Sequence, residues 1–363
     1  MKKKILFCIY NLNMGGIPTA MLSLLKCLDS NKYDITLLIE KKYGFFIDNI
    51  PNHIKIINYD LDESNNGNRL FRKIKNRLKL IKWIIKIWNK YDFSACYTTY
   101  SIPSSILARY ASKNNAIWIH GDYYEVFNHC TNKIKEFFNK IKVNKYKNII
   151  FVSNSSKENF IKVYPELTNK CKSFNNVIDY NNIIIKSNEK LEINKSHTTF
   201  LHVGRHLDDV KKISLIINNS YKLKKEGYDF EVWLIGDGPS TNDYKKMVQK
   251  LKIQKNVIFL DKKQNPFPYY KKADALILSS KYEGNPVVFV EAMVLNKPIV
   301  TTNVSDALIN IDRKFGIVTN NDEESLYLGM KKFLDEGFII KEKFNPQKFN
   351  NEILKEIEEI INE

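Results

Sequence analysis

Residues 273–302, ADALILSSKYEGNPVVFVEAMVLNKPIVTT, predict a strand, a loop, a helix and a second strand. Apolar runs of strand length stand at the two ends, Ala275–Leu278 and Ile299–Thr302. Between them, Asn285 is a typical N-cap residue, and Pro286 is favoured at the first helical position. Strands that alternate with helices in this way build parallel α/β sheets, so this stretch predicts the fold class.

The loop inside this stretch has the composition of a nucleotide-sugar site. The first amides of the helix, near Val287 and Val288, lack partners within the helix and attract anions, phosphate above all. Glu283 precedes the helix and Glu291 follows eight residues later, so two acids that can hold sugar hydroxyls flank these amides. Two glutamates at this spacing also occur by chance, as a capping acid and a surface acid.

The segment EGNPVVFVE, residues 283–291, resembles the E-x7-E signature of retaining glycosyltransferases with two Rossmann-like domains, the GT-B type, glycosyltransferase family 4. The resemblance covers nearly the whole chain and is stronger over 199–340. It implies two parallel-sheet α/β domains that face a cleft. We expect an acceptor-binding domain at 1–180, a nucleotide-sugar domain at 181–345, and a last helix at 346–363 that crosses back to the first domain.

Two further loops of the second half match the family pattern. Arg205 follows an expected strand, and an arginine fork with a lysine charge suits a diphosphate, although both could be ordinary surface charges. Lys211 and Lys212 are both candidates, because the gap after Arg205 is one residue longer than in the family; the S-L-I-I that follows favours Lys211. The segment GDGP, which begins at Gly236, resembles the family's loop near the nucleotide.

The first half offers a glycine loop and a histidine. Gly15 and Gly16 lie between an expected strand and helix, either as a tight turn or as the family's loop over the donor phosphates and the acceptor. No G-x-G-x-x-G follows, so a dinucleotide site is not supported. His120 ends an expected strand. A lone histidine is more often structural, but this one matches the family's strand-end histidine near the transferred sugar.

Positive charge is concentrated in the first half. The net charge is +17, of which residues 1–180 carry +15. Residues 69–90 hold nine Lys or Arg and no acid, and a second basic stretch runs from 133 to 147. The helix expected at 69–90 is amphipathic, with large apolar residues at Leu70, Ile74, Leu78, Ile81, Ile85 and Trp88. Its basic residues, with Trp83 and Trp88, favour an anionic membrane surface as partner over a solvated helix packed on the sheet.

Composition bears on the cellular location of the protein. Five scattered cysteines argue for a reducing compartment, and no apolar run reaches the eighteen residues of a membrane span. We therefore expect a cytoplasmic protein bound peripherally to the inner face of the cell membrane. The D-x-D at Asp60 and Asp62 lies in a polar turn, so we expect no metal and no cofactor.

The resemblance implies a sugar transfer from a nucleoside diphosphate sugar, with a preference for UDP, to a hydroxyl of a glycan or lipid-linked acceptor in surface polysaccharide synthesis. The transferred group would be a hexose or an N-acetylhexosamine. The alternatives are a nucleotide-sugar epimerase of the same fold and a nucleic-acid-binding protein, the latter suggested by charge alone and without a recognised motif.

The resemblance also assigns roles to residues. Glu283 would orient the transferred sugar, Glu291 the ribose, and His120 would lie beside the sugar or acceptor. Arg205 and Lys211 would stabilise the leaving diphosphate. The catalytic candidates are thus Glu283, His120, Arg205 and Lys211, and the donor-binding candidates are Gly15, Gly16, Arg205, Lys211, Gly236, Gly284, Asn285, Val287, Val288 and Glu291.

Overall fold

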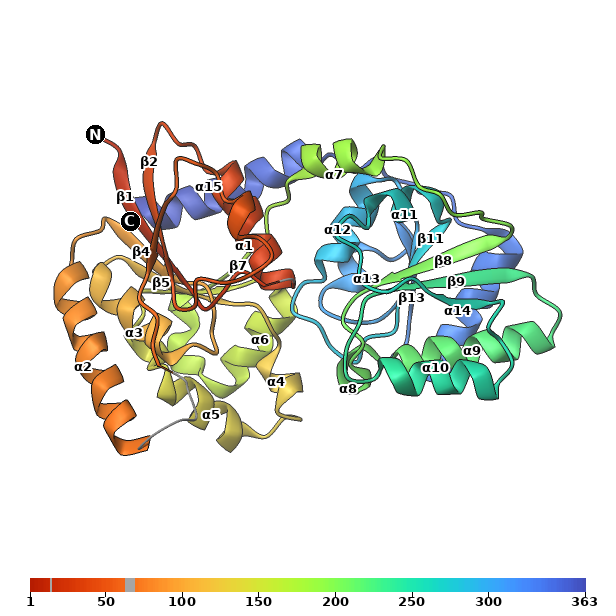
Figure 1. The fold of residues 1–363 in the computed structure, drawn as a ribbon, viewed down its shortest axis with the longest axis horizontal. Coiled ribbons are helices and arrows are strands. Elements are labelled where there is room, and N and C mark those ends of the chain that lie inside the picture. Colours follow the sequence, from red (N-terminus) through yellow and green to blue (C-terminus); the bar gives the residue numbers. More distant parts are fainter. Residues whose placement is uncertain (14, 63–68) are drawn as a thin grey trace. The chain divides into compact units, whose positions relative to one another are not determined.

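The computed structural model describes residues 1–13, 15–62 and 69–363. It divides into two compact units: Met1–Ile178 with Gln347–Glu363, and Asp179–Pro346 (Figure 1). Each unit contains one sheet in which all assigned strand pairs are parallel, with helices on both faces. The predicted fold class, two Rossmann-like α/β domains, is confirmed.

The sheet of the first unit has seven described strands in the order β3-β2-β1-β4-β5-β6-β7. Their bounds are β1 Lys3–Ile9, β2 Tyr33–Ile39, β3 Lys55–Asn58, β4 Phe93–Cys96, β5 Asn115–Ile119, β6 Asn148–Phe151 and β7 Cys171–Ser173. The helices are α1 Gly16–Cys27, α2 Arg69–Ile87, α3 Ile102–Ala111, α4 Tyr123–Val126, α5 Thr131–Lys140, α6 Asn154–Val163 and α15 Pro346–Asn362, with short 3-10 turns at Ile47–Asn49, Val143–Lys145 and Pro165–Lys170.

Two hydrophobic cores cover the two faces of this sheet. Side chains alternate along a strand, so Ile5 and Phe7 of β1 face the core under α1 and α15, whereas Leu6 and Cys8 face the core under α3, α5 and α6. Because both faces are buried, the central strands are nearly continuous apolar runs. The chain order reverses between β1 and β4, and crevices at such switch points hold ligands in open α/β sheets.

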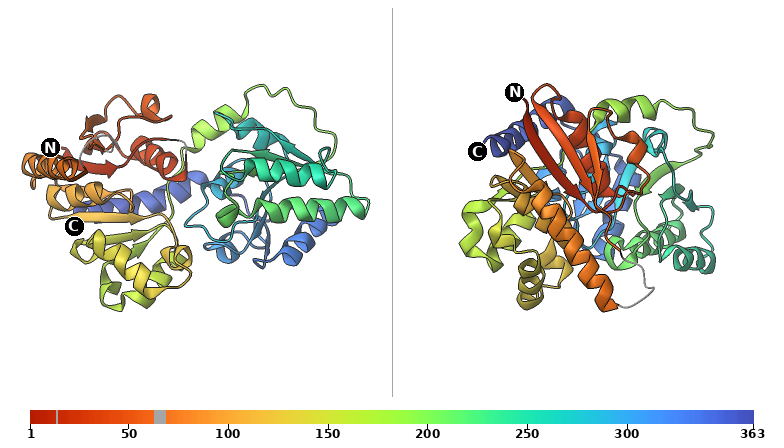
Figure 2. Two further views of the ribbon diagram at one scale, coloured as in Figure 1. Left: turned by 60° about the horizontal axis from the view of Figure 1, so that its bottom comes forward. Right: turned by 60° about the vertical axis from the view of Figure 1, so that its left-hand side comes forward.

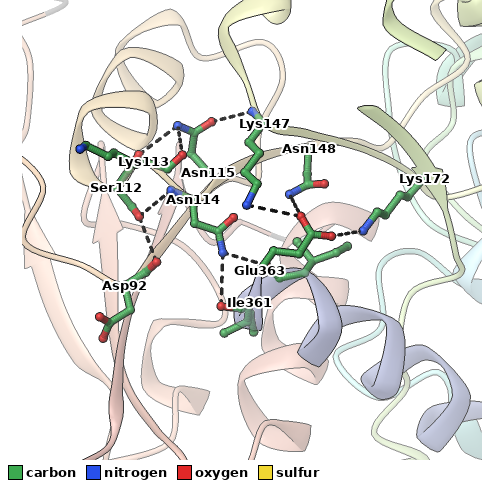
Figure 3. Close-up of polar contacts among 11 residues, drawn as sticks. Asp92, Ser112, Lys113, Asn114, Asn115, Lys147, Asn148, Lys172, Ile361 and Glu363 are labelled. Atoms are coloured by element: carbon green, nitrogen blue, oxygen red, sulfur yellow. Dashed lines mark hydrogen bonds and ion pairs between the residues drawn. The ribbon is translucent and has the colours of Figure 1, made fainter. Parts of the chain in front are cut away.

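The C-terminal helix α15 belongs to the first unit. Its residues Ile353, Ile357 and Ile360 are buried in the core beside α1. Figure 3 shows the end of this helix: Asn114 Nδ2 donates to the carbonyl of Ile360 at 2.8 Å, and the Glu363 carboxylate accepts from Asn148, Lys147 and Lys172 side chains. The helix therefore attaches to the sheet through both apolar burial and a polar end.

Asn350 of α15 holds the backbone of Ile178, the residue after which the second unit begins. Its Oδ1 accepts from the amide of Ile178 at 2.9 Å, and its Nδ2 donates to the carbonyl of the same residue at 2.8 Å. The chain leaves the first unit after Ile178. The next residue, Asp179, caps α7, whose amide at Asn182 donates to the Asp179 carboxylate.

The sheet of the second unit has six described strands in the order β10-β9-β8-β11-β12-β13. Their bounds are β8 Thr198–Val203, β9 Phe230–Ile235, β10 Val257–Phe259, β11 Ala275–Leu278, β12 Ile299–Thr302 and β13 Gly316–Thr319. The helices are α7 Tyr180–Ser187, α8 Asp208–Lys211, α9 Ile213–Lys225, α10 Thr241–Lys250, α11 Phe267–Lys272, α12 Val287–Val294, α13 Ala307–Asn310 and α14 Glu323–Glu336. The order reverses between β8 and β11, so the loops after these strands border the switch point.

Helix α2 packs on the unit by a different face from the one that the sequence pattern outlines. Leu80, Trp83 and Ile84 pack against the core with Ile87 buried, and Figure 1 shows the helix along the outer side of its unit. Trp83, expected beside Trp88 on a membrane-facing surface, is thus a packing residue. Among the described residues, no helix is both long and apolar enough to cross a membrane.

Candidate functional site

Three loops at the carboxyl edge of the second sheet form the candidate site. The loops after β8 and β9 are interlocked by their backbones: the His206 amide donates to the Asp237 carbonyl at 3.0 Å. Gly236 has a φ of +144°, and a Cβ there would lie 1.8 Å from the Gly204 carbonyl oxygen. Only glycine fits this approach. The position of Arg205, between the two contacts, is therefore set by the backbone, while its side chain is exposed.

Lys211 and Glu283, 72 residues apart in the chain, meet at this edge. Lys211 Nζ forms an ion pair with Glu283 Oε1, and Ser280 Oγ donates to the same oxygen at 2.7 Å. Both side chains are mostly buried, at 22% and 15% exposure. Within the described chain, the other oxygen, Glu283 Oε2, accepts no hydrogen bond. The pair thus presents one cation and one unoccupied carboxylate oxygen at the strand ends.

A break in the helix after β8 decides which of the two lysines reaches Glu283. Lys212 adopts a left-handed conformation, with a φ of 49°, and separates α8 from α9. Lys211 ends α8, where its carbonyl accepts from Ser279 Oγ at 2.8 Å. The amide of Lys281 donates to the Val210 carbonyl at 2.7 Å. These two bonds tie α8 to the loop after β11 and bring Lys211, not Lys212, to Glu283.

Helix α12 begins one residue later than predicted. Its N-cap is Pro286, with an extended ψ of 105°, so Asn285 is not the cap. No side chain caps this helix, which leaves the first-turn amides of Val287 and Val288 oriented toward the loop. Gly284 is held by Ser305, whose Oγ donates to its carbonyl at 2.6 Å. The helix for which we predict anion binding therefore begins without a side-chain cap, and three residues separate its first residue, Val287, from Glu283.

Glu291 is a buried acid with a neighbour that the sequence did not reveal. Its Oε2 accepts from the Tyr270 hydroxyl of α11 at 2.8 Å. Burial raises the pKa of this carboxyl to about 7. The phenol of Tyr270 stabilises the ionised form, but less than burial opposes it. Glu291 can therefore change protonation near neutral pH, and Tyr270 sets the direction of its carboxylate.

His202 is a second group that sequence reasoning missed. It is buried in β8, with Nδ1 3.1 Å from the Ile277 carbonyl, so Nδ1 carries the proton. Its Nε2 is buried and has no hydrogen-bond partner within the residues described. Burial and the charge of Lys211 lower its pKa to about 3, and the ring is neutral. A histidine in the apolar end of an expected strand, two residues before Gly204, was the available signal.

The remaining candidates belong to the first unit. Gly15 is the N-cap of α1, and its carbonyl accepts from the amide and hydroxyl of Thr19 at 3.1 and 2.9 Å. His120 follows the last residue of β5, and its ring lies 4.5 Å from that of Tyr97. Burial lowers the pKa of His120 to about 3, so it is neutral at physiological pH. Gly15, Gly16 and His120 lie at carboxyl ends of strands, where ligand-binding groups of α/β sheets are found.

The described residues were also compared with the requirements of a metal site. In 1–13, 15–62 and 69–363, no group of three His, Cys, Asp or Glu is placed to hold a metal ion. Asp60, the first acid of the D-x-D, instead forms an ion pair with Lys41 at 3.3 Å.

Comparison with known proteins found one matching family model and several similar proteins. Residues 183–359 match the family described as Glycosyl transferases group 1. The chain is 32% identical over 166 residues to an uncharacterised glycosyltransferase of Methanocaldococcus jannaschii, covering 44% of this chain and 40% of the relative. It is 26% identical over 232 residues to the N-acetylgalactosamine-N,N'-diacetylbacillosaminyl-diphospho-undecaprenol 4-alpha-N-acetylgalactosaminyltransferase of Campylobacter jejuni, covering 60% and 62%. The matches thus span less than two thirds of these two relatives.

A longer match and two solved structures extend the similarity. A second Campylobacter jejuni protein, an alpha-1,4-N-acetyl-D-galactosaminyltransferase named for a diphospho-undecaprenol-linked substrate, is 25% identical over 88% of this chain and 86% of its own. Anabaena HepE in complex with UDP and glucose has a TM-score of 0.75 at 17% identity, covering 98% and 99%. A Rickettsia africae glycosyltransferase has a TM-score of 0.73 at 18%, covering 99% of both.

The fold and part of the sequence resemble those of glycosyltransferases. The chain has the GT-B fold of glycosyltransferases, and the glycosyl transferases group 1 match covers residues 183–346 of its second unit and reaches into α15.

Proposed function

We propose that this protein is a retaining glycosyltransferase of family 4, which transfers a sugar from a UDP-sugar to a hydroxyl of a glycan or lipid-linked acceptor. The observation that carries the proposal is the pairing of Lys211 with Glu283 beside the uncapped start of α12. The cation and the helix amides suit the diphosphate of the donor. The carboxylate at the same strand edge suits the hydroxyls of the sugar.

The leaving diphosphate gains negative charge as the glycosidic bond breaks. Arg205, Lys211 and the amides of Val287 and Val288 would stabilise that charge, each at a point fixed by the contacts described above. Because these groups supply the positive charge, we propose that the reaction needs no divalent cation.

The two acids would act on opposite ends of the donor. Glu283 keeps Oε2 available for sugar hydroxyls while Lys211 and Ser280 hold Oε1. Glu291, held by Tyr270, would accept from the ribose hydroxyls. Glu283 is held by a cation and a hydroxyl at one oxygen, an arrangement that suits an orienting group rather than a covalent nucleophile. We therefore propose retention by attack from the same face of the sugar as the departing diphosphate.

Substrate classes are proposed from the relatives. The two Campylobacter jejuni relatives are named for acceptors linked to diphospho-undecaprenol and for N-acetylgalactosamine transfer, and HepE was solved with UDP. We propose a UDP-linked hexose or N-acetylhexosamine as donor, a polyprenyl-linked or glycan acceptor, and a role in surface polysaccharide or glycolipid synthesis. Such an acceptor would place the protein on the cytoplasmic face of an anionic membrane, with His120 and the Gly15–Gly16 loop beside the acceptor or the sugar.

The test is turnover of variants that keep the fold. Glu283→Gln and Arg205→Ala should each lower turnover by about two orders of magnitude, the size typical of lost transition-state contacts. The matched controls are Glu336→Gln and Arg313→Gln, which replace exposed residues of the same unit.

Three results would contradict the proposal. A folded Glu283→Gln protein with wild-type turnover would remove the site assignment. Release of free sugar with inverted stereochemistry at a ring carbon would indicate the epimerase. Salt-dependent binding to duplex DNA without binding to any nucleotide sugar would indicate the nucleic-acid-binding alternative.

A further inference from the structure

A row of large apolar side chains is exposed on α2 and on Trp88, the residue that follows it. The row consists of Leu70, Ile74, Leu78, Ile81, Ile85 and Trp88, with exposures from 44% for Ile81 to 69% for Ile85. It runs the length of a 19-residue helix. Monomeric soluble proteins rarely expose a continuous apolar surface of this extent, and such surfaces mark sites of interaction.

This row is not a loosely packed edge of the core. The packing face of α2 is formed by Leu80, Trp83, Ile84 and Ile87, and the Asn76 side chain donates to the Asp62 carbonyl at 2.7 Å on that side. At about 100° per residue, the centre of the exposed row lies roughly 125° around the helix from the centre of the packing face. In the right-hand view of Figure 2, α2 crosses the front of its unit. The helix is thus seated by one face and presents another.

Basic residues border the exposed row on both sides. Lys75 and Lys82 lie along one border, and Lys73 and Arg77 along the other, when the helix is projected at the same angle. Residues 69–90 contain no acid. An aliphatic centre between two cationic borders matches a bilayer interface, with acyl chains under the centre and phosphates at the borders.

This charge pattern also selects among occupants. A second copy of the chain that docked through the same face would bring two helices, each with eight basic residues and no acid, against each other, which is repulsive. The phosphates of a nucleic acid would neutralise the lysines and arginines but leave the aliphatic row in water. An anionic bilayer neutralises the basic residues and also buries the aliphatic row.

We propose that α2 inserts its exposed apolar row into an anionic bilayer, with the flanking lysines and arginines at the lipid phosphates. This goes beyond attraction of a basic surface to lipid, because the aliphatic row adds a component of binding that salt does not screen. The inference rests on the proposed function only for its use, which is to bring the enzyme to a lipid-linked acceptor.

The experiment is sedimentation with vesicles of phosphatidylcholine containing or lacking phosphatidylglycerol, without donor or acceptor. The apolar variant carries Ile74→Gln, Leu78→Gln, Ile81→Gln and Ile85→Gln. The matched control carries Leu308→Gln, Ile309→Gln and Leu328→Gln, which are exposed apolar residues of the second unit. The apolar variant should lose about tenfold or more in partitioning onto anionic vesicles, while the control binds like wild type. Neither set should shift the melting temperature much, because all the side chains are exposed.

Two further measurements separate insertion from surface attraction. A basic variant, Lys75→Gln with Arg77→Gln and Lys82→Gln, should bind anionic vesicles less while keeping the salt-resistant component. Its control carries Lys250→Gln, Lys255→Gln and Lys332→Gln. Acyl-brominated lipid should quench the fluorescence of wild-type protein, and Trp88→Phe should remove most of that quenching.

The outcomes are distinguishable. An apolar variant that binds like wild type would overturn insertion. Dimerisation of wild type that the apolar variant abolishes, without vesicle binding, would assign the row to a second copy and would also overturn it. Vesicle binding by a protein that transfers no sugar would contradict the proposed function and leave this inference standing.

Discussion

The ion pair between Lys211 and Glu283 shows what residue spacing can and cannot predict. Both residues were candidates from their loops, and the structure brings them together. The choice of Lys211 over Lys212 follows from the left-handed Lys212, a backbone feature that residue type does not reveal. Tyr270, the partner of Glu291, comes from another helix 21 residues away in sequence, so no local pattern could have paired the two.

Separate replacements of Lys211 and Lys212 test which of the two binds the donor phosphates. Lys211→Ala should lower turnover by about two orders of magnitude, because it removes a phosphate-binding charge and leaves the Glu283 carboxylate without its cation. Lys212→Asn should stay within a few-fold of wild type, since asparagine tolerates the left-handed conformation. Steady-state kinetics of the two proteins test this. Equal losses, or a larger loss in Lys212→Asn, would contradict the assignment.

The raised pKa of Glu291 predicts a pH-dependent stability. Burial raises this pKa from 4.5 to about 7, so the folded protein keeps a proton that the unfolded chain has released. The resulting stabilisation is complete below about pH 4.5 and is lost as the pH rises through 7. The melting temperature of wild type should therefore fall over this range relative to Glu291→Gln, which cannot ionise. Parallel curves for the two proteins would mean that Glu291 is ionised throughout.

At the scale of elements, the second unit was predicted more closely than the first. The strands at Ala275–Leu278 and Ile299–Thr302 have their predicted bounds. The strands β3 and β7 were missed, because they are short edge strands with lysines in them, and such strands lack the apolar run that marks a buried one. Helix α7 was not predicted, and it begins at the expected domain boundary after residue 180.

Helix α2 shows why an amphipathic pattern does not fix orientation. Its apolar residues cover more than one face, and the pattern cannot tell which face meets the core. The structure packs the helix through Leu80, Trp83, Ile84 and Ile87 and exposes the longer row. Only the tertiary packing distinguishes the two.

The packing of α15 predicts that its residues stabilise the first unit, although the helix lies at the far end of the sequence. Ile360 is fully buried in the first-unit core. Ile360→Ala should destabilise that unit by about 2–5 kcal/mol through lost burial and a residual cavity. Replacing the exposed Lys355 by alanine in the same helix should change stability little. Thermal unfolding followed by circular dichroism compares them. An unchanged melting temperature for Ile360→Ala would contradict the packing of α15 on the first sheet.

For the whole molecule, the two-domain α/β fold followed from alternating strand and helix patterns, and the structure confirms it. The uneven charge predicted a basic first half, but charge alone does not identify a partner. The exposed row on α2 adds the geometric observation on which the membrane inference depends.

Metal independence is a property of the complete enzyme and its donor. Arg205, Lys211 and the α12 amides are proposed to neutralise the diphosphate without a cation. Turnover should therefore survive EDTA at a concentration that strips divalent ions. A glycosyltransferase known to need manganese serves as the positive control. Loss of turnover with EDTA and its recovery on adding magnesium or manganese would contradict the proposal.

The central claim is that the second unit holds a UDP-sugar for transfer with retention. The most direct measurement incubates wild type and Glu283→Gln with a panel of UDP- and GDP-linked α-sugars and a polyprenyl-diphosphate-linked glycan. Melting curves report binding, and NMR reports the anomeric configuration of the product. The account predicts that at least one UDP-sugar stabilises the protein, by about 2.7 kcal/mol at a hundredfold excess over its Kd, and gives an α-linked product that Glu283→Gln forms about a hundredfold more slowly. A β-linked product, or no stabilisation and no transfer with any nucleotide sugar, would contradict it.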